Sequence, residues 1–239
     1  AWTCCTQSLT HEFVMNKTFQ FWNPSLLLGL AIVGLFAAMA ISPGLFSSQD
    51  PAGLRLEHRL SAPSAANWFG TDGVGVDVYS RVVYGARTTL ATIVIVLGIA
   101  ILVGVSIGSV SGYLGGWIDG LLMRVADVFL AFPPLILALA TNAVLGRGLQ
   151  QTMFAVAFLW WPAYARLVRS QILAVRKLEF VESARAIGAN EFRIVGRHVL
   201  PNVLDPVIVR ASLDAGFVAL TAASLSFLGL GAQPPTPEW

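Results

Sequence analysis

Charged residues are scarce in this sequence. Asp, Glu, Lys and Arg make up 12% of its 239 residues, whereas soluble domains carry roughly 25%. Hydrophobic residues make up 56%, and the mean hydropathy is +0.71. A soluble fold could not bury this much apolar surface, so we expect the lipid bilayer to be the solvent. The net charge of only +2, without a basic and aromatic stripe, argues against nucleic acid as a partner.

Motifs for catalysis, metal binding and nucleotide binding are also lacking. The two cysteines, Cys4 and Cys5, are adjacent and form neither a disulfide framework nor a spaced metal site. The sequence has no GxxxxGK[ST] loop, no HExxH motif and no Ser/His/Asp constellation, and its three histidines are dispersed. We therefore expect a protein that is not an enzyme and holds no cofactor or metal of its own.

Long apolar runs are what the sequence does contain. A helix needs about 20 apolar residues to cross roughly 30 Å of hydrocarbon. Backbone polar groups must be paired within lipid, so the runs predict an all-α, polytopic transmembrane bundle. Prolines inside the third and fourth runs predict kinks rather than breaks. The five predicted spans are residues 24–46, 88–113, 121–145, 151–168 and 206–230.

Basic residues between the spans predict the orientation. The segment 166–210 holds eight Lys and Arg residues against four acidic residues, which places it in the cytoplasm. Met15 would make a natural start, so residues 1–14 are a candidate for sequence that is not native. The predicted organisation is a cytoplasmic segment 1–23, a first span 24–46, an extracytoplasmic loop 47–87, a permease-like core 88–230 with a cytoplasmic loop at 169–205, and an extracytoplasmic tail 231–239 that stops before a sixth span.

The cytoplasmic loop predicts two short helices joined by a turn. Gly188 stands where a helix would end in a left-handed residue, Asn190 can cap a second helix, and Pro201 would close it. Periodicity alone is equally consistent with an amphipathic hairpin lying on the membrane surface. The residues of the first helix that share one apolar face are Ile172, Val175, Val181, Ala184 and Ile187.

The same loop resembles a known signature. Glu182, Ala184, Gly188, Leu200 and Pro201 are spaced as in the cytoplasmic loop of permease subunits of ATP-binding-cassette importers. The resemblance extends over residues 67–239 and points to the dipeptide, oligopeptide and nickel branch of the family. The segments that carry this second resemblance are WFGTDGVGVDVYSRVVYGAR, ANEFRI, RHVLPN and SLSFLGLGAQPPTPEW.

The resemblance implies a set of partners. They are a second homologous permease subunit, two ATPase subunits that bind ATP and Mg²⁺, and an extracytoplasmic substrate-binding protein, assembled in the cytoplasmic membrane of a bacterium. The apolar face through Val181, Ala184 and Ile187 is expected to pack against an ATPase subunit. The residues implied in this coupling contact are Val181, Glu182, Ser183, Ala184, Ile187, Gly188, Leu200 and Pro201. The transported solute is expected to be a peptide or a related small solute such as nickel.

The sequence departs from the family at three places. Ser183 stands where the signature usually has alanine, and Val76 stands where the outer loop commonly has arginine. Relatives often carry an acid just before SLSFLG, where this chain has Ala222 and Ala223. A role for an acid at that point of the fifth span is therefore not implied here.

Charged residues inside the spans are candidates for the translocation path. A charge at the centre of a span costs at least about 2.5 kcal/mol, so it needs a partner or a wet cavity. Arg124 and Asp127 are predicted to form a local ion pair. Asp214 is expected either to pair with Arg210 or to meet a peptide amine or a metal cation in the pore.

A rival class of protein is an ion-coupled secondary transporter or channel. In that class Asp127 and Asp214 would hold the coupling ion or proton. The two classes differ in whether uptake into vesicles needs an ATPase and ATP or only an ion gradient.

Overall fold

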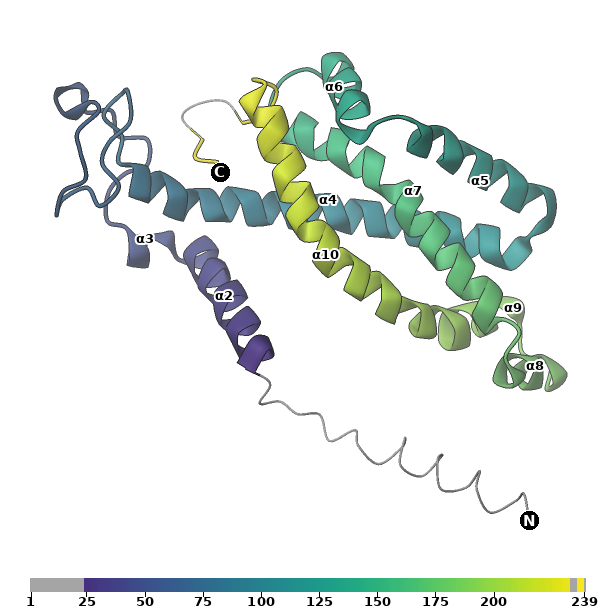
Figure 1. Cartoon of the computed structure of the whole chain (residues 1–239). Coiled ribbons are helices and arrows are strands. Elements are labelled where there is room, and N and C mark those ends of the chain that lie inside the picture. Colours follow the sequence, from purple (N-terminus) through teal and green to yellow (C-terminus); the bar gives the residue numbers. More distant parts are fainter. Residues whose placement is uncertain (1–23, 233–235, 239) are drawn as a thin grey trace, which may run out of the picture.

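The computed structural model describes residues 24–232 and 236–238, which form helices joined by loops. The predicted segment 1–23 and residues 233–235 and 239 of the tail lie outside the described residues. Figure 1 shows the helices, which are α2 (Pro24–Ile41), α3 (Pro43–Phe46), η1 (Leu56–His58), α4 (Val78–Leu114), α5 (Gly116–Ala131), α6 (Pro134–Leu145), α7 (Leu149–Val175), α8 (Glu179–Ala186), α9 (Glu191–Ile194), the π-helical η2 (Val195–Val199) and α10 (Leu200–Phe227).

Fewer helices than predicted have the length and apolarity of a membrane span. Among the described residues, α2 and α4 meet both conditions, and the pair α5 and α6 makes a third if it counts as one bent span. The helices α7 and α10 have 27 and 28 residues, which is long enough to cross a bilayer. They carry arginines or an aspartate in their middle, however, which reduces their apolarity and explains the difference from the five predicted spans.

The third predicted span is broken rather than kinked. The axes of α5 and α6 differ by 96°. Phe132 and Pro133 have extended backbone angles between the two helices, and Pro134 begins α6. A residue before proline is driven out of the helical region, and two successive prolines extend that effect over two residues. Pro162 and Pro206, in contrast, lie inside α7 and α10 without ending either helix.

The helix α4 begins ten residues earlier than the apolar run predicts. The carboxylate of Asp77 accepts hydrogen bonds from the backbone N–H of Ser80, at 2.8 Å, and from its hydroxyl, at 2.7 Å. This N-cap starts the helix while the sequence is still polar. The last ten residues of the predicted extracytoplasmic loop, 78–87, are therefore the first turns of α4.

The helix pair α4 and α7 forms the centre of the molecule, and α10 crosses both (Figure 1). Glycines allow the close approach of α4 to α7. A Cβ built on Gly104 would lie 2.5 Å from Cβ of Tyr164, and one built on Gly108 would lie 2.5 Å from the carbonyl oxygen of Ala165. Gly112 continues the same stripe one turn later. This GxxxGxxxG pattern is a sequence signal for close packing of membrane helices.

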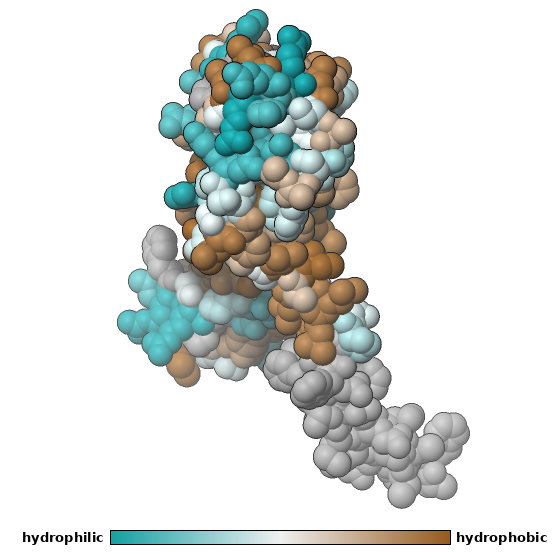
Figure 2. All heavy atoms as spheres, turned by 90° about the vertical axis from the view of Figure 1, so that its left-hand side faces the viewer, coloured by the Kyte–Doolittle hydropathy of each residue, from teal (hydrophilic) through white to brown (hydrophobic). Residues whose placement is uncertain are grey.

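The molecule has two distinct ends. The α8 end comprises α8, α9, the end of α7 that precedes them, and the ends of α4 and α5 that are bonded to that part of α7. The loop segment comprises residues 47–77 before α4. Both ends are seen in Figure 1. Figure 2 looks onto the loop segment and shows hydrophilic side chains gathered there, with hydrophobic side chains of α2 below it. Tight turns occur in the loop segment at Gly70 and Gly75, which have φ of 73° and 80°.

Candidate functional site

The turn after α8 has the geometry that the sequence predicts. Gly188 has φ of 80°, in the left-handed region. Its N–H donates to the carbonyl of Arg185 at 3.0 Å, and the N–H of Ala189 donates to the carbonyl of Ala184 at 3.1 Å. These two bonds form a Schellman motif, which fixes the direction in which the chain leaves α8. The prediction of a left-handed Gly188 is confirmed.

The second helix of the loop does not end at Pro201. The carbonyl of Asn190 accepts hydrogen bonds from Arg193 and Ile194, so a helix begins at Glu191 as predicted. It then continues through the π-helical η2 into α10, and Pro201 lies in the first turn of α10. Proline lacks the N–H that a helix interior requires, and the change from π-helical to α-helical pairing takes place just where that N–H is missing. Leu200 and Pro201 therefore start a helix instead of closing one.

The apolar face of α8 is turned into this chain, contrary to prediction. Val181 is fully buried and Ala184 is 8% exposed, both within the main hydrophobic core. Ile187, predicted on the same face, is 85% exposed because it lies beyond the last turn of α8. A short helix at the surface buries its apolar face against its own fold first. The side chains that point outward are those of Leu178, Phe180, Glu182, Ser183 and Ile187.

Polar side chains connect the end of α7, just before α8, to the neighbouring helices α4 and α5. Arg169 on α7 donates to both carboxylate oxygens of Asp119 on α5, at 2.5 and 2.6 Å. The hydroxyl of Ser111 on α4 donates to the same carboxylate. Arg176, directly after α7, donates to the carbonyl of Gly112 at 3.0 Å. These contacts join three helices just before α8, and sequence reasoning missed them because the partners are 50 and 64 residues apart.

The predicted local pair of Arg124 and Asp127 is wrong. Asp127 pairs instead with Arg166 on α7, and both of these side chains are about half exposed. Arg124 is exposed on α5. The packing of α5 against α7 brings Arg166 within reach of Asp127, which no spacing within α5 could reveal.

Asp214 pairs with Arg210, as one of the two predicted alternatives states. Nε of Arg210 donates to Oδ2 of Asp214 at 2.9 Å, one turn apart on α10. The pair lines a cavity of about 400 Å³ between α10, α7 and the bend from α5 to α6. Tyr164 lies close enough to interact electrostatically with Asp214. The other lining residues are Leu130, Pro134, Leu159, Trp160, Ala163, Phe217 and Thr221.

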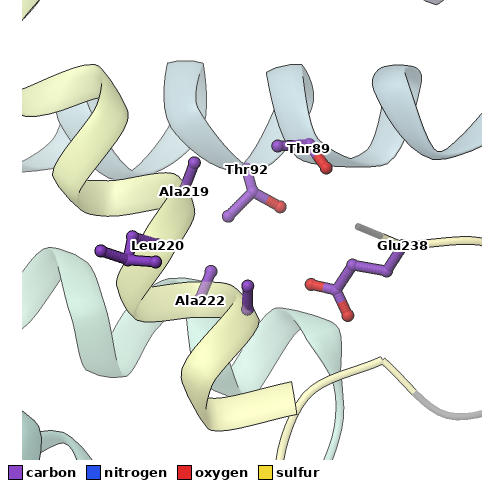
Figure 3. Close-up of a pocket in the computed structure, with 7 residues that line it drawn as sticks. Thr89, Thr92, Ala219, Leu220, Ala222 and Glu238 are labelled. Atoms are coloured by element: carbon purple, nitrogen blue, oxygen red, sulfur yellow. The ribbon is translucent and has the colours of Figure 1, made fainter. Parts of the chain in front are cut away.

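A second cavity, of about 230 Å³, lies between α4 and α10 (Figure 3). Ala222 and Ala223 line it, so α10 itself contributes no carboxylate to its lining. A carboxylate is nevertheless present, because Glu238 extends into the cavity from the end of the chain. Its Oε2 accepts hydrogen bonds from the Ser226 hydroxyl at 2.6 Å and from the Ala232 N–H at 3.3 Å. Within the described residues, no three His, Cys, Asp or Glu side chains gather into a possible metal site.

Several known proteins are similar to this chain. Residues 100–239 match the family model described as "Binding-protein-dependent transport system inner membrane component". The dipeptide transport system permease protein DppC of Alkalihalophilus pseudofirmus is 44% identical over 217 residues, which are 91% of this chain and 71% of that protein. The glutathione transport system permease protein GsiD of Pectobacterium atrosepticum is 40% identical, over 92% of this chain and 75% of that protein.

One solved structure supports the fold. A chain of the MetNI methionine ABC transporter, in an inward-facing form, superimposes with a TM-score of 0.55 at 22% identity. The match covers 64% of this chain and 76% of that chain. At this identity the likeness concerns the fold alone, and it agrees with the predicted all-α bundle.

Proposed function

This chain belongs to the family of binding-protein-dependent transport system inner membrane components, and from its place as a permease of an ABC importer in the inner membrane we propose that it carries short peptides. The observation that carries this proposal is 40–44% identity to permeases named for dipeptides and for glutathione, over nine-tenths of the chain. Neither of these two relatives is named for nickel, so a peptide is the better-supported solute.

The proposed complex has the usual separation of tasks. ATPase and substrate-binding partners follow from the family, and the finer composition is part of the proposal: one further homologous permease and two ATPase subunits that hold ATP and Mg²⁺. In this arrangement the α8 end faces the cytoplasm and the loop segment faces the outside. The basic residues around α8 support that orientation.

The α8 end is the proposed docking surface for an ATPase subunit. Val181 and Ala184 are buried within this chain, so the contact is made by the outward side chains of Glu182, Ser183 and Ile187. Gly188 sets the exit direction of the chain, and Leu200 and Pro201 begin the helix that continues to the Asp214 cavity. A displacement of α8 would therefore act on both α7 and α10, in the manner of a rigid-body hinge.

The cavity beside Asp214 is the proposed part of the translocation path. It lies against the middle of α7 and α10, between aromatic walls formed by Trp160 and Phe217. Arg124 and Asp127 remain candidates for the same path, because both side chains are exposed on α5.

Reconstituted vesicles test the proposal. The permeases, the cognate ATPases and the binding protein are incorporated together, and uptake of a labelled dipeptide is measured with ATP or with an imposed ion gradient. ATP-dependent uptake is expected. Uptake driven by the gradient alone, without the ATPases, would reject the importer and favour the ion-coupled class.

A charge reversal at the docking surface sharpens this test. Glu182→Lys should reduce co-purification of the ATPase subunits and ATP-driven uptake together, because Glu182 is exposed on α8. Ser183→Ala is the matched control on the same helix. It removes only a hydroxyl that donates to the carbonyl of Glu179 at 2.8 Å, so association and uptake should persist. If Glu182→Lys behaves like the control, this face of α8 is not the contact.

A further inference from the structure

The ion pair in the α10 cavity presents its positive member to the cavity. The Asp214 side chain is 5% exposed, whereas that of Arg210 is 50% exposed. Asp214 is in contact with Arg210 through Nε. Among the described residues, the guanidinium of Arg210 makes no further hydrogen bond, although it has four other N–H groups. The buried carboxylate thus orients the arginine, and the exposed end of the arginine remains available.

We propose that Arg210, oriented by Asp214, binds the C-terminal carboxylate of the peptide during translocation. This inference rests on the proposed peptide transport and names the chemical group that the path recognises. It also reverses the expectation that Asp214 meets an amine or a metal cation, since the carboxylate is almost fully covered and its accessible neighbour is a cation. A guanidinium fits a carboxylate through two parallel N–H bonds, which a lysine ammonium cannot reproduce.

The depth of Arg210 supports a ligand at this point. Arg210 lies ten residues into α10, about 15 Å along the helix from its start. A half-exposed charge at such a depth is disfavoured in lipid. Asp214 is bonded to Nε alone, so the exposed end of the guanidinium indicates a water-filled cavity. The cavity beside it offers about 400 Å³. Its walls of Leu159, Trp160 and Phe217 lower the local dielectric constant and suit an apolar peptide side chain.

The experiment compares a dipeptide with its C-terminal amide. Uptake of Ala-Ala and of Ala-Ala amide is measured for the wild-type complex and for Arg210→Gln, in the same vesicles with the same binding protein. The binding protein is the same in both complexes, so its own preference cancels when the acid-to-amide uptake ratio of the variant is divided by that of the wild type. The acid-to-amide ratio should fall about tenfold or more in Arg210→Gln, because a hydrogen bond to a charged group is lost only for the acid.

Two control variants separate recognition from folding. The double variant Arg210→Gln with Asp214→Asn removes both charges, so that no buried Asp214 carboxylate is left without its arginine, and it should show the same fall in the ratio. Arg210→Lys keeps the charge without the planar fork and should give an intermediate ratio. Equal losses for acid and amide in all three variants would overturn the proposal, since Arg210 would then act only in structure or in contact with another subunit.

A second measurement works without the binding protein. Thr221 lines the same cavity, so Thr221→Cys in a chain lacking Cys4 and Cys5 provides a labelling site. Ala-Ala at millimolar concentration should slow labelling more than Ala-Ala amide does, and Arg210→Gln should abolish the difference. Equal protection by both peptides would reject the carboxylate site. A wild-type complex that takes up neither peptide with ATP would instead reject the peptide function on which this inference rests.

Discussion

The α8 end and the loop segment are both rich in polar contacts, but the contacts at the α8 end connect residues far apart in the sequence, whereas those of Asp72 in the loop segment connect residues close in the sequence. At the α8 end, Asp119 and Arg169 are 50 residues apart, and Arg176 reaches the carbonyl of Gly112 across 64 residues. In the loop segment, Asp72 accepts hydrogen bonds from the N–H groups of Val74 and Val76 and from Arg81, all within nine residues. The α8 end therefore joins separate helices, whereas the loop segment mainly stabilises its own conformation.

This difference suits the proposed mechanism. A docking surface that transmits motion must be fastened to several helices at once, because otherwise a displacement of α8 would be absorbed by the loop itself. The glycine stripe on α4 and the Asp119 contacts on α5 provide that attachment to α7. A surface outside the bundle needs only a defined shape. The comparison predicts that changes at the α8 end affect stability and coupling, while changes in the loop segment have local effects.

The largest effect is expected from Gly108→Val. A Cβ at this position would lie 2.5 Å from the carbonyl oxygen of Ala165 and 2.8 Å from Cβ of Val168, neither of which is the flexible end of a side chain. The helices α4 and α7 would have to separate, at a cost of about 3 kcal/mol, the upper end of the usual range for overpacking. Thermal unfolding of the purified protein in detergent measures the loss.

Gly98→Val is the matched control for that variant. Gly98 lies on the same helix, and a Cβ there would meet no atom within 4 Å. The control carries the same small change in helix propensity without the clash, so its unfolding temperature should stay close to that of the wild type. Similar losses in the two variants would show that the close approach of α4 to α7 does not limit stability.

The next largest effect is expected from Asp119→Asn. The change removes the charge that Nε–H and one Nη2–H of Arg169 contact, in a site where the Asp119 side chain is only 16% exposed. The expected loss is about 2 kcal/mol, typical of a hydrogen bond to a charged group. Coupling should also weaken, because α5 is no longer bonded to the end of α7 that precedes α8. The number of peptides taken up per ATP hydrolysed measures this coupling.

Asp127→Asn provides the comparison within the same helix pair. Its partner Arg166 also lies on α7, but both side chains are about half exposed. Exposed pairs contribute about 0.5 kcal/mol or less, so stability should change little, and the peptide-to-ATP ratio should fall less than in Asp119→Asn. If Asp119→Asn and Asp127→Asn lower the peptide-to-ATP ratio equally, the Asp119–Arg169 pair near the end of α7 has no special role in coupling.

Features with local causes could be predicted from the sequence. The left-handed turn at Gly188, the start of a helix after Asn190 and the pair of Arg210 with Asp214 each depend on residues within one or two turns. Apolar runs likewise predicted an all-α bundle, although the polar start of α4 depends on the cap at Asp77. Fold class and local geometry therefore follow from spacing and composition.

Features with distant causes could not be predicted in the same way. The partner of Asp127 is 39 residues away, and that of Asp119 is 50 residues away. Periodicity identified the apolar face of α8 but not whether Val181 would meet this chain or another one. The prolines Pro133 and Pro134 predict a kink at this position, but not an angle as large as the 96° between α5 and α6. Only the packed arrangement of the helices decides these points.

A smaller effect on stability, with a specific loss of coupling, is expected from Gly188→Val. A residue with a branched Cβ is strained at φ of 80° by about 1 kcal/mol or more, even though no neighbouring atom lies within 4 Å of the new Cβ. The chain would leave α8 in another direction and displace α9. Gly188→Asn is the control, because asparagine tolerates the left-handed region. ATP-driven uptake should be lost in the valine variant and largely kept in the asparagine variant, with membrane insertion unchanged in both.

The smallest effect is expected in the loop segment, from protonation of Asp72. Burial raises the pKa of Asp72, but the N–H groups of Val76 and Val74 and the guanidinium of Arg81 outweigh it, so the pKa lies below its ordinary value of 3.8. A carboxylate with a lowered pKa stabilises the folded loop above the unfolded pKa, and this stabilisation is lost as the pH falls through the folded pKa. The contribution should be about 1 kcal/mol or less, since Arg81 is partly exposed.

Hydrogen exchange at the Val74 and Val76 amides measures this loss at the loop segment. Wild type and Asp72→Asn are compared at each pH, so that the intrinsic pH dependence of exchange cancels. Wild type should be better protected near neutral pH, and the difference should shrink as the pH falls below 3.8 and through the lowered pKa of the folded Asp72 carboxyl. Protection around Arg169 and Arg176 should stay the same in both proteins, because the loop segment is bonded mainly to itself. A difference in protection that persists unchanged at low pH would contradict a role for the Asp72 charge. A difference that extends to the α8 end would contradict the conclusion that the loop segment stabilises mainly itself.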